Sequence, residues 1–272
     1  MVTGDHEDIV RLTGLRAELR RDAILSRRTR IVRAGGLPED CAGELKRKHP
    51  FHLALQIPGF QLHYRQGRWR RLEHGYKGEP PVRLRETHAW ILRGRRKVGA
   101  MEFTEVDAEL VFPFSLFDAM DRESGYLADV AEAVLSCWPD LPFQVTCYGP
   151  ILLLDHVWFD RREGPTPALA ASLDAMIALL LPRCALMVAR PFPAEYGGRV
   201  PDDEAPSNVG FRRRLQAMVR LAERRFGFNR LPLPGDNDEV YLWRPRAGGQ
   251  VPAPVYHFNW RDTLETRPAN ER

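Results

Sequence analysis

The sequence contains few cysteines, and none of them belongs to a metal or redox motif. Four cysteines occur among 272 residues, at positions 41, 137, 147 and 184, and no two form a Cys-x-x-Cys pair. No nearby histidine completes a zinc-ligand spacing, so no metal site is expected. We therefore expect buried free thiols in a reducing compartment.

Signals for membrane insertion and export are also lacking. No run of eighteen apolar residues occurs, so we expect no membrane span. The first twelve residues, MVTGDHEDIVRL, place acidic residues where a signal peptide carries basic ones. The expected location is cytoplasmic.

The common catalytic motifs are missing too. The chain has no Walker loop, no His-Glu-x-x-His helix, no recognisable Ser-His-Asp constellation and no internal repeat. The glycines of RGRRKVG (93–99) are too sparse for a phosphate loop, and this stretch is interpreted as a hairpin turn.

The composition of the sequence is that of a globular protein, and its charge is distributed unevenly along the chain. Hydrophobic residues make up 44% and charged residues 28%, which are ordinary values for a domain with a core. Residues 1–86 hold 18 Lys and Arg against 11 Asp and Glu, whereas residues 87–272 have a net charge of −3. This asymmetry indicates either an anionic partner or a solvated basic face, and both interpretations stay open.

In the N-terminal part, apolar spacing predicts a helix over residues 5–31 and a strand over residues 51–57. Pro58-Gly59 predicts a turn, after which residues 60–74 continue a hairpin. The turn-rich stretch 75–81 is the predicted domain boundary.

From residue 87 onward, strand and helix patterns alternate, which predicts a layered α/β sheet with helices on its faces. The expected strands cover residues 87–94, 97–107, 151–159, 184–193 and 239–243. The nearly continuous apolar run at 151–159 is expected to be buried on both faces. One helix or two are expected over residues 116–138, begun by Asp118 or Asp121. Further helices are expected over residues 167–181 and over residues 211–226, the latter ended by Gly227.

The turn after strand 151–159 contains the parts of an anion site. Unpaired N–H groups at a helix N-terminus attract anions, and a glycine lets a phosphate approach the backbone. The segment 160–167 reads DRREGPTP, so it supplies a glycine and two arginines. Thr166 suits the N-cap and Pro167 the first helical position.

This strand–turn–helix arrangement resembles the GNAT family of N-acetyltransferases over about residues 88–244. The family motif Arg/Gln-x-x-Gly-x-Gly/Ala corresponds to RREGPT at 161–166. ILLLDHVWF (151–159) is similar to the strand before that loop, and CALMVARPFPAEY (184–196) to the next strand. FRRRLQAMVRLAERRFGFNRLP (211–232) is similar to the family's last helix. The resemblance implies a mixed, mostly antiparallel central sheet with helices on both faces.

The resemblance also implies acetyl-CoA as co-substrate and an amine as acceptor. The residues implied for the pyrophosphate are Arg161, Arg162, Gly164 and Thr166. Those implied for the acyl-CoA arm are Trp158 and Phe159, whose backbone would pair with the pantetheine.

The loop departs from the family motif at several positions. Thr166 replaces a small residue and Glu163 adds a negative charge, while Pro165 and Pro167 each remove a backbone donor. Losing one charge-assisted hydrogen bond costs roughly 1.5–3 kcal/mol. The loop is therefore either an acyl-CoA site supported by its arginines or a structural remnant.

Two residues are candidates for proton transfer. Asp155 is the carboxylate nearest the place where the resemblance puts a base, although it also suits a purely structural role. GNAT family members often carry a tyrosine early in the last helix, where it protonates the departing thiolate. Residues 211–226 contain no tyrosine, so Tyr196 in the preceding loop is the substitute candidate. His156 alternates to the opposite strand face from Asp155, so the two are not expected to act as a pair.

A second kind of site is suggested by the basic N-terminal part. Arginines interleaved with an aromatic residue are typical of proteins that hold nucleic acid through phosphate contacts and stacking. An acidic protein partner would explain the same charges. The candidate contact residues are Arg65, Arg68, Trp69, Arg70 and Arg71.

These observations predict three parts. Residues 1–86 form a basic N-terminal helix and hairpin module with α+β character, residues 87–246 a GNAT-like acyltransferase domain, and residues 247–272 a loosely ordered tail. The leading hypothesis is an acyl-CoA-dependent N-acyltransferase with a divergent pyrophosphate loop. The alternative is a catalytically inactive GNAT-like scaffold that binds a protein or nucleic acid through its N-terminal module.

Overall fold

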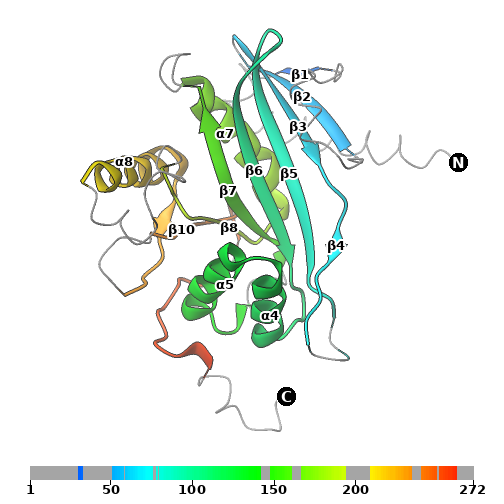
Figure 1. Cartoon of the computed structure of the whole chain (residues 1–272), viewed down its shortest axis with the longest axis vertical. Helices are drawn as coiled ribbons and strands as arrows, with labels where there is room; N and C mark the ends of the chain where they lie inside the picture. The colour runs from blue at the N-terminus through cyan, green and yellow to red at the C-terminus, as the bar shows by residue number, and fades with distance from the viewer. Residues whose placement is uncertain are drawn as a thin grey trace, which may run out of the picture. The chain divides into compact units, whose positions relative to one another are not determined.

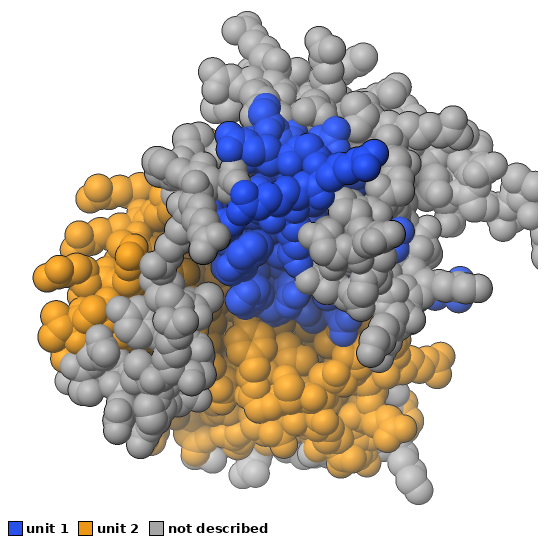
Figure 2. Space-filling model, turned by 45° about the horizontal axis from the view of Figure 1, so that its top comes forward, with its two compact units in different colours: residues 1–69, 85–104, 154–182 blue, residues 70–84, 105–153, 183–272 orange. Residues whose placement is uncertain are grey.

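The computed structural model describes residues 30–32, 51–57, 59–75, 78, 80–141, 148–160, 167–193, 209–234, 240–249 and 251–261. The chain is an α/β protein whose mixed sheet is mostly antiparallel (Figure 1). It divides into two compact units, coloured separately in Figure 2. The described parts of unit 1 lie within residues 30–69, 85–104 and 154–182. Those of unit 2 lie within residues 70–84, 105–153 and 183–261.

Unit 1 is built on a sheet with the strand order β1-β2-β3-β5-β6-β7. The strands are β1 (Arg30–Val32), β2 (Phe51–Ile57), β3 (Phe60–Gln66), β5 (Arg83–Arg93), β6 (Arg96–Asp107) and β7 (Ile151–Phe159). The last three also contribute residues to unit 2. Helix α7 (Pro167–Leu180) contacts β2.

The strands at 51–57 and 151–159 are confirmed with their predicted bounds. β5 begins four residues before the predicted strand, at Arg83. Gly59 has φ +79°, as a tight turn between β2 and β3 requires. Gly94 has φ +61° in the turn between β5 and β6, which confirms the predicted hairpin turn.

The predicted helix 5–31 is wrong at its C-terminal end. Arg30 and Ile31 belong to β1, which pairs antiparallel with β2, where Ile31 lies opposite Leu55. The β-branched pair Ile31-Val32 suits a strand, and the neighbouring strand supplies the hydrogen bonds that a helix would otherwise form internally. Residues 5–29 lie outside the described residues.

Unit 2 contains the helical pair α4 (Pro113–Glu123) and α5 (Gly125–Cys137). It also contains β4 (Arg70–Arg71), β8 (Leu186–Ala189), α8 (Val209–Phe226), β9 (Asn229–Arg230) and β10 (Leu242–Pro245). β8, β10 and β9 are consecutive in the sheet, and both of their pairings are antiparallel. The strand predicted at residues 239–243 corresponds to β10, which lies slightly further toward the C-terminus, at Leu242–Pro245.

The predicted cap at Asp118 or Asp121 is wrong, because α4 already begins at Pro113 and both aspartates lie inside it. Proline suits a first helical position because its missing N–H has no partner to lose there. Asp118 instead accepts hydrogen bonds from the Gly75 amide at 2.7 Å and from Arg122 at 3.0 Å. Ser124 caps α5, since its Oγ accepts from the Leu127 amide at 3.2 Å.

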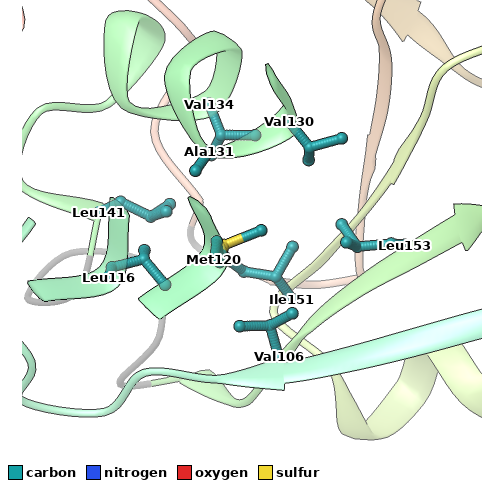
Figure 3. Close-up of a pocket in the computed structure, with 9 residues that line it drawn as sticks. All are labelled: Val106, Leu116, Met120, Val130, Ala131, Val134, Leu141, Ile151 and Leu153. Atoms are coloured by element: carbon teal, nitrogen blue, oxygen red, sulfur yellow. The ribbon is translucent and has the colours of Figure 1, made fainter. Parts of the chain in front are cut away.

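The core of unit 2 lies between α4, α5 and the strand segments beside them. Its side chains leave a cavity of about 10 Å³ (Figure 3). That volume is at the lower limit for a single water, and an entirely apolar lining offers such a water no partner. The cavity is therefore a packing space in the core. Its lining consists of Val106, Leu116, Met120, Val130, Ala131, Val134, Leu141, Ile151 and Leu153.

Residues 251–261 contact helices α4 and α5 of unit 2. The amides of Val255 and His257 donate to the carbonyls of Cys137 and Ser136, at 3.2 and 2.7 Å. These carbonyls belong to the last turn of α5, where no intrahelical donor remains. The side chain of Trp260 is only 1% exposed, so this segment adds both hydrogen bonds and apolar burial to the core.

Two of the cysteines lie among the described residues, and both are buried free thiols, as the composition predicts. Burial raises the pKa of the Cys137 thiol to about 12, so this group is a poor nucleophile. Among the described residues, no helix combines the length and apolar character needed to cross a membrane.

Candidate functional site

The strand predicted to precede the acyl-CoA loop is β7. Its first three residues are buried, but His156 and Trp158 are exposed, so the prediction of burial on both faces is wrong for the second half. Asp155 is half-buried, and Thr104 Oγ1 of β6 donates to Asp155 Oδ2 at 2.5 Å. This contact orients the carboxylate, which is the first candidate for a base.

The end of β7 presents two aromatic residues with different surroundings. The Trp158 side chain is 40% exposed, whereas Phe159 packs on Gly99 of β6. A Cβ at Gly99 would lie 2.8 Å from Phe159 Cδ2 and 3.0 Å from the Trp158 carbonyl oxygen. Gly99 therefore provides the space that lets the end of β7 lie this close to β6.

Asp160, the last described residue before the predicted loop, is held by β6. Its amide donates to the Val98 carbonyl at 2.8 Å, and its carboxylate pairs with Arg96 at 2.5 Å. The implied pyrophosphate residues Arg161, Arg162, Gly164 and Thr166 lie outside the described residues, as does Tyr196. The described chain resumes with α7, so residues 161–166 connect a strand end to a helix start.

A group of titratable side chains that was not predicted lies on β5 and β6. His88 Nε2 is 3.7 Å from Glu86 Oε2, and His88 Nδ1 is 3.7 Å from Glu102 Oε1. The ring also stacks on Trp90, with centroids 6.2 Å apart and planes 16° apart. Glu86, His88 and Trp90 alternate along one strand, so the spacing in the sequence was the signal that could have placed them on one face.

The charges around His88 fix its protonation state. Glu102 and then Glu86 raise the pKa of His88 to about 9, although partial burial opposes them. His88 in turn lowers the pKa of Glu102, against the effect of burial and with smaller help from His156 and Lys97. At neutral pH, His88 is therefore a cation held between two carboxylates and not a free base.

The stability of the fold is expected to depend on the proton of His88. Its folded pKa of about 9 exceeds the ordinary 6.5, so its contribution is complete below about pH 6.5 and is lost as the pH rises through about 9. A His88→Gln variant should therefore lose most stability relative to wild type below pH 6.5, with a smaller difference at pH 9.5. Urea unfolding of both proteins between pH 5.5 and 9.5 measures this difference.

Glu102 has the larger effect on His88, so Glu102→Gln should lower the pKa of His88 more than Glu86→Gln does. A titration of the His88 ring followed by NMR compares the two variants directly. A wild-type ring that titrates near 6.5 would contradict the arrangement.

The basic residues predicted to contact a partner have different surroundings. Arg65 lies opposite His88 in the β3–β5 register. The Arg85 guanidinium lies 4.3 Å from the centre of the Trp69 ring, and Arg70 makes two contacts with Glu123, at 2.7 and 2.5 Å. Arg68 and Arg71 are exposed. A ligand that used Trp69 or Arg70 would compete with these internal partners.

In the described part of the chain, no three His, Cys, Asp or Glu side chains come together as a metal-binding group. Comparison of the sequence with models of protein families gives no match, and comparison with curated proteins gives none either.

Proposed function

We propose that this protein is an acyl-CoA-dependent N-acyltransferase of GNAT type, with a divergent pyrophosphate loop at residues 161–166. The observation that carries the proposal is the run from β7 through this segment into α7. A strand end joined to a helix N-terminus directs free N–H groups toward an anion. Arg161 and Arg162 would add charge to this site.

The chemistry needs few protein groups. The acceptor nitrogen attacks the thioester carbonyl carbon, a C–N bond forms and the C–S bond breaks. Asp155 would take the proton from the nitrogen, directly or through a water, and Tyr196 would give one to the departing thiolate. The Thr104 hydroxyl orients Asp155, and the exposed Trp158 at the end of β7 supports its proposed place along the acyl-CoA arm.

Acetyl-CoA is expected to raise the melting temperature of the full chain by several degrees. A ligand at about 100 times its Kd stabilises the folded state by roughly 2.7 kcal/mol, which in a chain of this size corresponds to several degrees. Arg161→Glu should remove the shift while leaving the melting temperature without ligand nearly unchanged. Thermal unfolding and calorimetric titration give both quantities.

Arg95→Glu is the matched control. Arg95 is exposed in the β5–β6 turn, and its substitution changes the net charge by the same amount as Arg161→Glu. This variant should keep the full acetyl-CoA shift. No shift with wild type at millimolar acetyl-CoA would overturn the proposal and favour the scaffold hypothesis.

A further inference from the structure

Helix α8 (Val209–Phe226) is labelled in Figure 1. Its sequence places a row of arginines on the side opposite its apolar face. The helix contains six arginines and a single acidic residue, Glu223. Its buried side chains are Phe211, Leu215, Val219 and Phe226. Arg213, Arg220 and Arg224 are all exposed, and at 100° per residue they fall within about 40° of one line.

The charges of the row are not paired within the described part of the chain. Among the described residues, no carboxylate forms an ion pair with Arg213, Arg220 or Arg224, and Glu223 pairs with Arg230 at 2.8 Å. Several other arginines that solvent reaches do have carboxylate partners, namely Arg70–Glu123, Arg83–Asp107, Arg96–Asp160, Arg122–Asp118, Arg190–Asp129 and Arg261–Glu132.

Like charges four residues apart weaken a helix, and Arg220 and Arg224 have that spacing. The row therefore opposes the stability of α8 unless an external anion neutralises it. Its charges are all arginines, whose planar guanidinium groups match phosphate oxygens better than lysines do. With a rise of 1.5 Å per residue, the row extends about 16 Å.

We propose that the arginine row Arg213–Arg220–Arg224 of α8 binds the phosphate backbone of duplex DNA. A B-form duplex carries about one negative charge per 1.7 Å of its axis, so a row of this length lies beside about ten phosphates. The major groove of B-form DNA admits an α-helix, whereas that of duplex RNA is too narrow. The row carries no aromatic side chain for stacking on unpaired bases.

An acidic protein is the competing class of partner. Specific protein interfaces usually centre on buried apolar or aromatic side chains. Besides Val209 in the first turn, Leu221 is the large apolar residue exposed on α8, and arginines at 220, 224 and 225 surround it in the sequence. A line of charges with so little apolar surface favours a polyanion with regularly spaced phosphates. This proposal is independent of the acyltransferase activity.

The test is fluorescence anisotropy of the full chain with a labelled 20-base-pair DNA duplex, over a series of KCl concentrations. In the triple variant Arg213→Gln, Arg220→Gln and Arg224→Gln, the slope of log K against log salt should fall in magnitude by about 2.7, since each arginine that no longer neutralises a phosphate removes about 0.9. The affinity at 0.15 M salt should fall by about a hundred-fold. Circular dichroism should show that the variant keeps its helical content.

The control triple Arg83→Gln, Arg95→Gln and Arg122→Gln changes the net charge by the same amount at exposed positions that do not belong to α8. It should keep the wild-type slope. Equal losses in both triples, or no binding of wild type at 50 mM salt, would overturn the proposal. Binding of duplex RNA, single-stranded DNA or polyglutamate as tight as that of duplex DNA would overturn it too.

Discussion

Replacing Trp260 with alanine is expected to lower the free energy of unfolding by about 3–5 kcal/mol, as removal of a buried aromatic ring generally does. The Trp260 ring is 1% exposed and lies 5.3 Å from the Phe114 ring and 6.1 Å from the Phe117 ring, centre to centre. Its Nε1 donates to Glu132 at 3.0 Å. The variant has neither the ring packing nor this hydrogen bond.

The effect should be large because Trp260 belongs to a group of interacting side chains that joins the segment 251–261 to α4 and α5. Arg261 makes two contacts with Glu132, at 3.0 and 2.7 Å, and its guanidinium lies 4.6 Å from the centre of the Trp260 ring. The Trp138 indole also donates to the Pro252 carbonyl at 2.9 Å. Removing Trp260 is therefore expected to loosen the whole segment 251–261 from α5.

Urea unfolding measures the change, and Phe258→Ala is the matched control. Phe258 lies two residues away in the same segment but is 91% exposed, so its removal should change stability by less than about 0.5 kcal/mol. Trp260→Phe should fall between the two, because it keeps an apolar ring and loses the N–H. If Trp260→Ala behaves like Phe258→Ala, the segment does not stabilise unit 2.

Replacing Arg183 with methionine is expected to cost about 3 kcal/mol of stability. The Glu105 side chain is completely buried, and Arg183 Nη2 lies 3.8 Å from Glu105 Oε1. Removing one partner of a buried ion pair typically costs about 3–5 kcal/mol, because the other charge stays buried. The lower end applies because the Arg183 side chain is 32% exposed.

The double variant Arg183→Met with Glu105→Gln should recover much of this loss, since it removes the buried charge together with its partner. Arg122→Met is the control for an exposed pair, with Asp118, and should change stability by at most about 1 kcal/mol. A double variant that is no more stable than Arg183→Met would show that the charge of Glu105 does not cause the loss. Denaturant midpoints of wild type, Arg183→Met, the double variant and Arg122→Met measure these differences.

Local patterns in the sequence were sufficient where an element depends on its own residues. The alternation at 51–57, the apolar run at 151–159 and the stop at Gly227 each match the structure closely. Gly227 has φ +66°, as expected of a glycine that ends a helix. These signals are local because side-chain period and backbone strain act over only a few residues.

The same local reasoning was wrong where a distant segment decides the outcome. Residues 30 and 31 continue a helical pattern, but pairing with β2 makes them a strand. Asp118 resembles an N-cap, but the helix begins earlier and the carboxylate binds Gly75, 43 residues away in sequence. The run 151–159 is nearly continuous in apolar residues, and yet the second half of β7 exposes Trp158.

The candidate site shows a similar division. The sequence located β7 and led to the prediction of a site at Asp155 and the segment before α7, because a strand, a turn and a helix are consecutive in the chain. It did not identify the partner of Asp155, since Thr104 lies 51 residues away on another strand. It also missed His88, whose state depends on Glu102 from β6 and Glu86 from its own strand.

By itself, the sequence determined the α/β class, the main strands and helices, and the arginines of α8. Their character follows from composition and from periods of two and 3.6 residues. The tertiary structure alone decided which charges are neutralised, which side chains are buried and which pKa values shift. Ion pairs such as Arg183–Glu105 and contacts such as Trp260 with Glu132 join residues more than 70 positions apart, and no local period encodes their separation.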